Sequence, residues 1–162
     1  MKLRLWVLAC VVALGAIFPA SALAQKPMEP VEVDPVQFPA GEVCAFAVEL
    51  EPLVNKLKMK TFSSGRMMIT GTLKARVTNL HADPDRSMVV NISGRVTITP
   101  LPNGNARVVA AGRQLLIFFA TDIGGPGLFL TVGRGLSLID TNENLISFQQ
   151  SGRMIDVCAA LA

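Results

Sequence analysis

The sequence predicts an all-β protein, built as an up-and-down antiparallel β-barrel of about seven to eight strands. Two observations carry this prediction. Several segments alternate apolar and polar residues with the period of two that is typical of strands, and turn sequences rich in glycine, proline, asparagine and aspartate separate them. Many of these segments are longer than the roughly 5–6 residues of an ordinary strand. Long strands joined in order by hairpins favour a meander that closes on itself, with a β-sandwich as the alternative.

The strands are expected in sequence order, without helices between them. The alternation is clearest over 69–78 and 88–99. Asn103-Gly104 lies between two such runs and is a strong hairpin signal, because both residues tolerate positive φ. The turn residues at 124–127 and 141–144 separate the later runs in the same way. We therefore expect strands at 43–50, 56–62, 69–78, 88–99, 106–119, 128–140 and 145–158.

The chain begins with a segment typical of a secretory signal peptide. Lys2 and Arg4 precede an apolar run over 5–18, and small residues end the segment at Ala24. The run is shorter than the about 20 apolar residues of a membrane-spanning helix. We therefore expect cleavage after Ala24, a secreted, extracellular protein, and no transmembrane segment after cleavage.

The same segment has a second interpretation, lipidation at Cys10. An apolar run that ended there would be too short for export, so a lipoprotein is not expected. Four prolines in the next stretch, 25–40, predict an extended, solvated linker. The expected organisation is a signal peptide over 1–24, this linker, and a single β domain over 41–162.

Removal of the signal peptide changes both the charge and the cysteine count. Two of the 15 basic residues leave with it and all 12 acidic residues remain, so the mature chain is nearly neutral. Only Lys56, Lys58 and Lys60 are concentrated, as one solvated face of a strand, and we expect no nucleic-acid partner. Cys44 and Cys158 remain as an even pair near the two ends of a secreted domain, which predicts one structural disulfide. The alternative, a reactive thiol, would need an activating histidine or a C-x-x-C spacing.

The dipeptide Gly-Arg occurs five times. A glycine inside a long strand relieves crowding where a sheet coils or turns a corner. The arginines would then form a charged ladder on the exterior. The alternative is that they converge to contact an anionic ligand. The arginines concerned are Arg66, Arg95, Arg113, Arg134 and Arg153.

The sequence offers little catalytic or metal-binding chemistry. His81 is the only histidine and lies in a turn-like stretch, so neither a Ser-His-Asp triad nor a histidine zinc site can be assembled around it. The stretch 140–144 is similar to the start of a calcium loop. However, Leu145 replaces the expected glycine and Ser151 the closing glutamate, so a hairpin turn explains it better. We expect no cofactor and no metal, and no catalytic residue can be assigned.

The apolar content suggests what the protein binds. Residues 115–119 are apolar on both faces, which is typical of a central strand or of one that lines a cavity. The leading hypothesis is a non-catalytic binding module for a small apolar ligand or a protein partner at the cell surface. One alternative is a barrel-type isomerase or cyclase acting on an apolar substrate, which a pocket with a buried Arg, Asp or Gln would favour. Another is a cell-surface structural module, compatible with the proline-rich lead-in.

Short motifs are spread over most of the mature chain. They are Gly41-Glu42-Val43-Cys44-Ala45-Phe46, Thr78-Asn79-Leu80, Leu101-Pro102-Asn103-Gly104, Gly112-Arg113, Gly133-Arg134, and Gly152-Arg153 through Asp156-Val157-Cys158-Ala159. In these motifs the chain resembles a group of secreted actinobacterial proteins of unassigned function. Its strand-rich layout is also similar in architecture to allene-oxide-cyclase-like and dirigent-like barrels. The resemblance implies secretion and a barrel, and it brings no activity or site residues with it.

Overall fold

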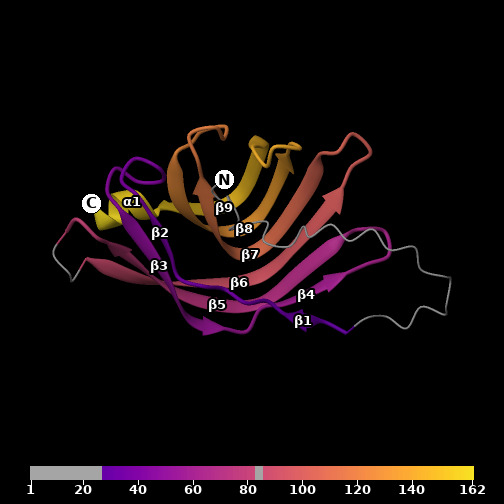
Figure 1. Ribbon diagram of the computed structural model, residues 1–162, viewed down its shortest axis with the longest axis horizontal. Coiled ribbons are helices and arrows are strands. Elements are labelled where there is room, and N and C mark those ends of the chain that lie inside the picture. The colour runs from indigo at the N-terminus through magenta and orange to yellow at the C-terminus, as the bar shows by residue number, and fades with distance from the viewer. Residues whose placement is uncertain (1–26, 83–85) are drawn as a thin grey trace.

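Residues 27–82 and 86–162 are described by the computed structural model in Figure 1, and apart from one short helix they form strands, turns and loops. The predicted signal peptide, with Cys10, lies outside the described residues. Every strand pair is antiparallel, which confirms the all-β class and the meander. The described elements are β1 (Glu29–Pro30), β2 (Val36–Phe38), β3 (Val48–Asn55), β4 (Lys58–Thr61), β5 (Met67–Asn79), β6 (Ser87–Pro100), β7 (Ala106–Phe118), β8 (Gly127–Ile139), β9 (Leu145–Asp156) and α1 (Val157–Leu161).

The five long strands β5 to β9 each pair with the next strand along the chain. Asn103-Gly104 lies in the turn between β6 and β7, as predicted, and 140–144 joins β8 to β9. At the other edge, β3 pairs with the second half of β5 and β4 with its first half. β3 and β4 therefore act as one edge strand, interrupted at Lys56 and Leu57. β2 and β1 extend this edge by pairing with β3 and β4 respectively.

The sheet does not close into a barrel, so the predicted closure is wrong. On one side β9 pairs with β8, and on the other it pairs with no strand of residues 27–82 and 86–162. The nine strands found in the described part of the chain all belong to one hydrogen-bonded sheet rather than to the two sheets of a sandwich. A barrel requires strands that tilt and stagger evenly until the first and last meet. Here the long strands fold back along their own length, which brings their own ends together instead of the two edges of the sheet.

Five glycines mark the line of this fold. Gly71, Gly94, Gly112, Gly133 and Gly152 are successive register partners on β5 to β9 and form one continuous row across the sheet. All except Gly94 have φ between 105° and 136°. A Cβ atom at any of the five would collide with a carbonyl oxygen of the neighbouring chain segment. Glycine alone satisfies both conditions. We call this row the glycine crease.

The rings of Phe118 and Phe148 show how far β7, β8 and β9 fold back. Phe118 pairs with Gly127 at one end of β8, whereas Phe148 pairs with Ser137 toward the other end. In a straight strand Gly127 and Ser137 would lie about 33 Å apart, yet the two ring centroids are 5.5 Å apart. The two halves of these strands therefore face each other across the crease. Figure 1 shows β7, β8 and β9 curving above β5 and β6.

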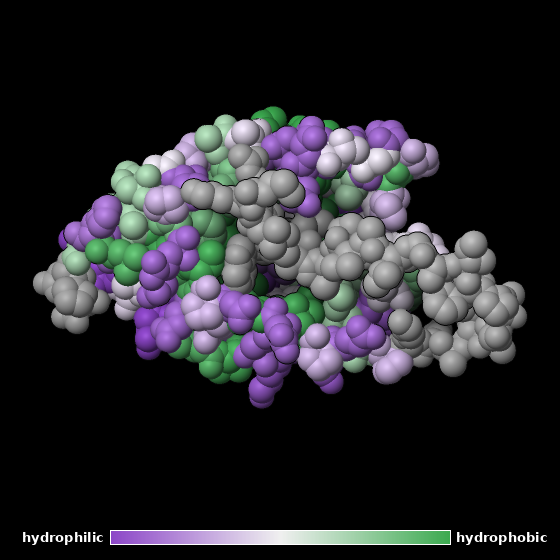
Figure 2. Space-filling view, in the orientation of Figure 1, coloured by the Kyte–Doolittle hydropathy of each residue, from purple (hydrophilic) through white to green (hydrophobic). Residues whose placement is uncertain are grey.

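The main core lies between β3, β5 and β6 and the ends of β7 and β8 beyond the crease. Val48, Val77, Val90 and Leu128 are fully buried there. A second, smaller cluster of buried apolar side chains lies around Ile98, on the other side of the crease. The exposed surface mixes polar and apolar residues, and Figure 2 shows hydrophilic side chains prominent along its lower edge.

Part of the predicted linker over 25–40 belongs to this core. Val36 and Phe38 pair with Leu50 and Val48, and Phe38 is buried. The Phe38 ring centroid lies 6.1 Å from that of Phe119. Prolines are tolerated on an edge strand, because the N–H that they lack would face the open side of the sheet. Within this predicted linker, Val36 and Phe38 are thus packed rather than solvated, and Gln37 between them is exposed.

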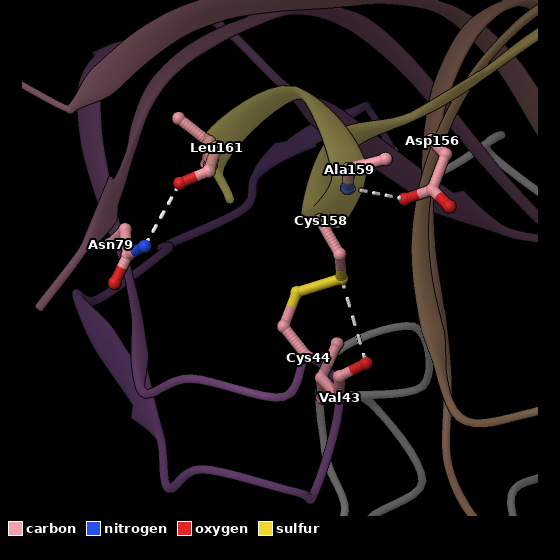
Figure 3. The surroundings of a disulfide bond; sticks show 7 residues. All are labelled: Val43, Cys44, Asn79, Asp156, Cys158, Ala159 and Leu161. Carbon is pink, nitrogen blue, oxygen red and sulfur yellow. Dashed lines mark hydrogen bonds between the residues drawn. A yellow bond between two sulfur atoms is a disulfide. The ribbon is translucent and has the colours of Figure 1, made fainter. Parts of the chain in front are cut away.

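Cys44 and Cys158 form the predicted disulfide, shown in Figure 3. The two Cα atoms are 5.5 Å apart, within the usual range, and the sequence separation is 114. The Cys158 sulfur also lies 3.6 Å from the carbonyl oxygen of Val43. This contact is not a hydrogen bond, because a sulfur atom in a disulfide carries no hydrogen to donate. The bond joins the turns at 43–46, where a strand was expected from residue 43 onward, to the C-terminal helix.

The short helix α1 replaces the end of the strand predicted over 145–158. Asp156 caps it by accepting a 2.9 Å hydrogen bond from the N–H of Ala159. At the other end, the Asn79 amide donates to the carbonyl oxygen of Leu161 at 2.9 Å (Figure 3). One turn and a half is too short to show a helical period in the sequence. Within the described residues, no helix is long and apolar enough to cross a membrane.

Candidate ligand cavity

A cavity of about 120 Å³ lies between the two folded-back halves of β7, β8 and β9. Val108 and Ala110 line it on one side of the crease, and Leu116 and Phe118 line it on the other. Phe148 of β9 contacts Phe118 and completes an aromatic wall. An apolar cavity of about 150 Å³ stays dry and can bind benzene. The cavity therefore has the size and lining to hold one small apolar molecule.

A few polar side chains interrupt this apolar lining, among them Gln114 and Gln150. Space for their amides comes from glycines. The Gln114 Nε2 atom lies 2.9 Å from where a Cβ on Gly94 would be, and the Gln150 Oε1 atom lies 3.0 Å from the corresponding position on Gly135. Thr131 is buried, and its hydroxyl donates a long 3.4 Å hydrogen bond to the Gln114 carbonyl oxygen. The cavity thus offers an apolar volume with a small number of amide and hydroxyl groups.

Asp122 fastens the loop between β7 and β8 to the start of β9. Its carboxylate accepts hydrogen bonds from the N–H of Phe119 at 2.6 Å and from the N–H of Leu145 at 2.7 Å. The N–H of Ile123 donates to the Leu145 carbonyl oxygen at 3.0 Å. Since this loop and the start of β9 lie at opposite ends of the folded strands, these bonds hold the two halves together. Phe119, Asp122 and Leu145 all line the cavity, so we call these contacts the Asp122 clasp.

Replacing Asp122 with alanine is expected to loosen the clasp. Hydrogen bonds to a charged acceptor contribute about 1.5–3 kcal/mol each, so local opening becomes roughly 10- to 100-fold more frequent. Native-state hydrogen exchange of the Leu145 amide measures this change. Asp156→Ala is the matched control, because its carboxylate also accepts a backbone hydrogen bond but caps α1 at the far end of β9. Unchanged exchange at Leu145 in Asp122→Ala would contradict the clasp.

The stretch 140–144, which is similar to a calcium loop, is the hairpin turn between β8 and β9. The Asp140 Oδ1 atom accepts hydrogen bonds from the N–H of Asn142 at 2.8 Å and from the N–H of Asn144 at 2.9 Å. Glu143 takes φ of 66°, as a tight turn requires. The backbone N–H of Asn144, and then its side chain, hold the pKa of Asp140 below its ordinary value. The carboxylate is thus engaged by the turn itself.

The five Gly-Arg arginines do not line the cavity. Arg66 lies apart from the others, with its guanidinium 4.2 Å from the ring centroid of Phe62 in the turn before β5. Its Gly65 is not part of the crease, where Gly71 takes the corresponding place on β5. The remaining four arginines are exposed and each follows a crease glycine: Arg95, Arg113, Arg134 and Arg153.

Sequence patterns identified one part of the cavity lining, residues 115–119, which are apolar on both faces, but they did not identify Asp122 or Phe148. Asp122 lies in a turn whose glycines and proline predict only a break between two strands. Three of the four β8 residues that line the cavity are small, Thr131, Gly135 and Ser137, and the fourth is Ile139. Small residues on one face of an otherwise apolar strand indicate space beside that face. Only the fold-back of the strands, however, places Phe148 at the same cavity.

His81 does not line the cavity. It is exposed, and its backbone N–H donates a hydrogen bond to the Asn79 side chain at 2.9 Å. In the part of the chain that the structure describes, no group of three or more His, Cys, Asp or Glu residues could hold a metal ion. Comparison of the chain with protein-family models, with curated proteins and with solved structures gave no match.

Proposed function

We propose that the protein is a secreted, non-catalytic binding protein that holds a small apolar ligand between the folded-back halves of β7, β8 and β9. The observation that carries the proposal is the cavity of about 120 Å³, bounded by Val108, Ala110, Phe118 and Phe148. Ligand pockets are typically apolar with a few polar groups that fix orientation. Gln114 and Gln150 are suited to that second role.

Secretion is part of this proposal. It is supported by the signal-like segment that ends at Ala24 and by the Cys44–Cys158 disulfide, since disulfides persist in oxidising compartments. Cleavage after Ala24 would leave four residues, Gln25 to Met28, ahead of β1. The ligand would then be met outside the cytoplasm.

The enzymatic alternative, an isomerase or cyclase, would need an acid or base at the cavity. Two carboxylates line the cavity, those of Asp122 and of Glu143 in the turn between β8 and β9. Each carboxylate oxygen of Asp122 already accepts a backbone hydrogen bond, from Phe119 and from Leu145. A general base must be able to reach the proton that it removes, and this carboxylate is used to hold the loop. Glu143 is exposed, and Asp122, Gln114 and Gln150 are only half-buried. These observations favour binding over catalysis.

The proposal is tested by filling the cavity. Ala110 faces the cavity and its neighbour Ala111 is exposed on the opposite face of β7. Ala110→Leu is expected to weaken binding of indole at least about tenfold, because the added side chain occupies the ligand volume. Ala111→Leu makes the same chemical change outside the cavity and leaves binding unchanged.

Indole fluorescence is a suitable readout, because the chain has no tyrosine and its one tryptophan, Trp6, lies in the signal-like segment. A blue shift on titration with the mature protein reports entry into an apolar site. Equal binding by both variants, or no indole binding by the parent protein and no small molecule retained in native mass spectrometry, would refute the proposal.

A further inference from the structure

Four arginines lie together on the outer side of the glycine crease, one on each of four neighbouring strands. Arg95, Arg113, Arg134 and Arg153 belong to β6, β7, β8 and β9. Side chains alternate between the two faces of a strand, and the sequence neighbours Val96, Gln114 and Gly135 line the cavity. The arginines therefore point away from the cavity, and all four are exposed.

The antiparallel register arranges these arginines in a zigzag along the crease. Arg95 and Arg134 lie on one side of it, both paired with Ala111 of the strand between them. Arg113 and Arg153 lie on the other side, both paired with Val132. Strands are about 4.8 Å apart, so the members of each pair are about 10 Å apart at their backbones. Because the strands fold back around the cavity, this outer side is a convex ridge.

The positive charge of the ridge is not compensated locally. The sequences of β5, β6, β7 and β8 contain no Asp or Glu, and β9 contains only Asp156 at its end. An ion pair joins Arg76 to Glu51 of β3. Among the described residues, the four ridge guanidiniums form no ion pair or hydrogen bond. The nearly neutral mature chain is thus polarised, with much of its acidic charge in the segment from Glu29 to Glu51.

We propose that this ridge docks the protein on an anionic lipid surface. Basic side chains near such a surface are attracted to its negative potential. Val132, 37% exposed, lies between Arg113 and Arg153, and Leu136, 39% exposed, follows Arg134 on the same face. These aliphatic side chains gain from contact with lipid and gain nothing from a soluble polyanion. A linear polyanion is usually held in a groove, whereas a convex ridge can touch a flat surface.

Vesicle co-sedimentation of the mature protein tests the docking. Binding to vesicles of phosphatidylcholine with phosphatidylglycerol is expected at low salt, with little binding to phosphatidylcholine alone, and it falls as salt screens the charges. Each Arg→Gln substitution on the ridge weakens binding about fivefold, and the quadruple variant R95Q/R113Q/R134Q/R153Q weakens it more than about 100-fold. Circular dichroism and the midpoint of thermal unfolding verify that this variant is folded.

A control variant separates the ridge from total charge. R66Q/K74Q/R86Q/R107Q removes four exposed basic residues that do not belong to the ridge and is expected to keep most of the vesicle binding. Equal losses in the two quadruple variants would overturn the docking site, as would absence of binding to anionic vesicles. Ridge-dependent binding of dextran sulfate without vesicle binding would overturn the lipid as partner. None of these outcomes depends on whether the cavity binds indole.

Discussion

Gly133→Ala is expected to lower the free energy of unfolding by about 3–5 kcal/mol. Gly133 has φ of 136°, a conformation that costs other residues about 1–3 kcal/mol. Its added Cβ would also collide with the carbonyl oxygen of Ser151 on β9, and crowding of a packed backbone costs about 1–3 kcal/mol more. Urea denaturation followed by far-ultraviolet circular dichroism measures the loss.

Gly41→Ala is the matched control for the crease. Gly41 also has positive φ, 86°, but a Cβ there would meet nothing within 4 Å. Its substitution therefore carries only the left-handed penalty of about 1–2 kcal/mol. Similar losses in the two variants would mean that the close approach of β8 and β9 at the crease does not exist. Gly133→Ala should in addition lose indole binding, since the crease forms the cavity.

Removal of the disulfide by Cys44→Ala with Cys158→Ala is expected to have an equally large effect. The bond spans 114 positions, and closing so long a loop in the unfolded chain is worth about 4–5 kcal/mol in the chain-entropy model. For a domain of this size the midpoint of thermal unfolding should fall by roughly 10–20 °C. Differential scanning calorimetry measures both quantities.

A reducing agent gives the control for this second prediction. Reduction of the parent protein should lower its unfolding temperature to about that of the double-alanine variant, and the variant itself should not respond. A parent protein that is as stable reduced as oxidised would contradict the stabilising role of the bond. In that case the buried side chains of Val157 and Leu161 in α1 would hold the C-terminus in place without the disulfide.

The strands were predictable because their residues obey a short-range rule. The period of two over 69–78 and 88–99 gave β5 and β6, and Asn103-Gly104 gave the hairpin that follows them. Elements that depend on distant partners were not predictable. Phe38 is buried only because β2 pairs with β3, and α1 is too short to show a period of its own.

Part of the glycine crease could be predicted from the sequence. The repeated Gly-Arg dipeptides indicated glycines where a sheet coils, and four of the five lie in the crease. The fifth, Gly65-Arg66, lies in a turn, and Gly71 completes the row without an arginine after it. Register decides membership of the row, and register follows from the lengths of all the hairpins together. The dipeptide alone therefore could not separate Gly65 from Gly71.

Long strands predict closure into a barrel, and this prediction is wrong. The glycine crease both prevents the closure and forms the cavity. Long strands must curve, and curvature around a common axis gives a barrel. In this chain the crease concentrates the curvature on one line, so Phe118 meets Phe148 while the outer edge of β9 stays unpaired among the described strands. The cavity depends on that long-range contact, which no local pattern encodes.

Diffraction from crystals of the protein held under xenon pressure tests the central claim most directly, because xenon binds in apolar cavities. The fold-back of β7, β8 and β9 predicts a xenon peak enclosed by Val108, Ala110 and Phe118, with the Phe118 and Phe148 rings in contact. Rings that lie apart at the two ends of extended strands, or xenon found only in the main core around Val77 and Leu128, would contradict it.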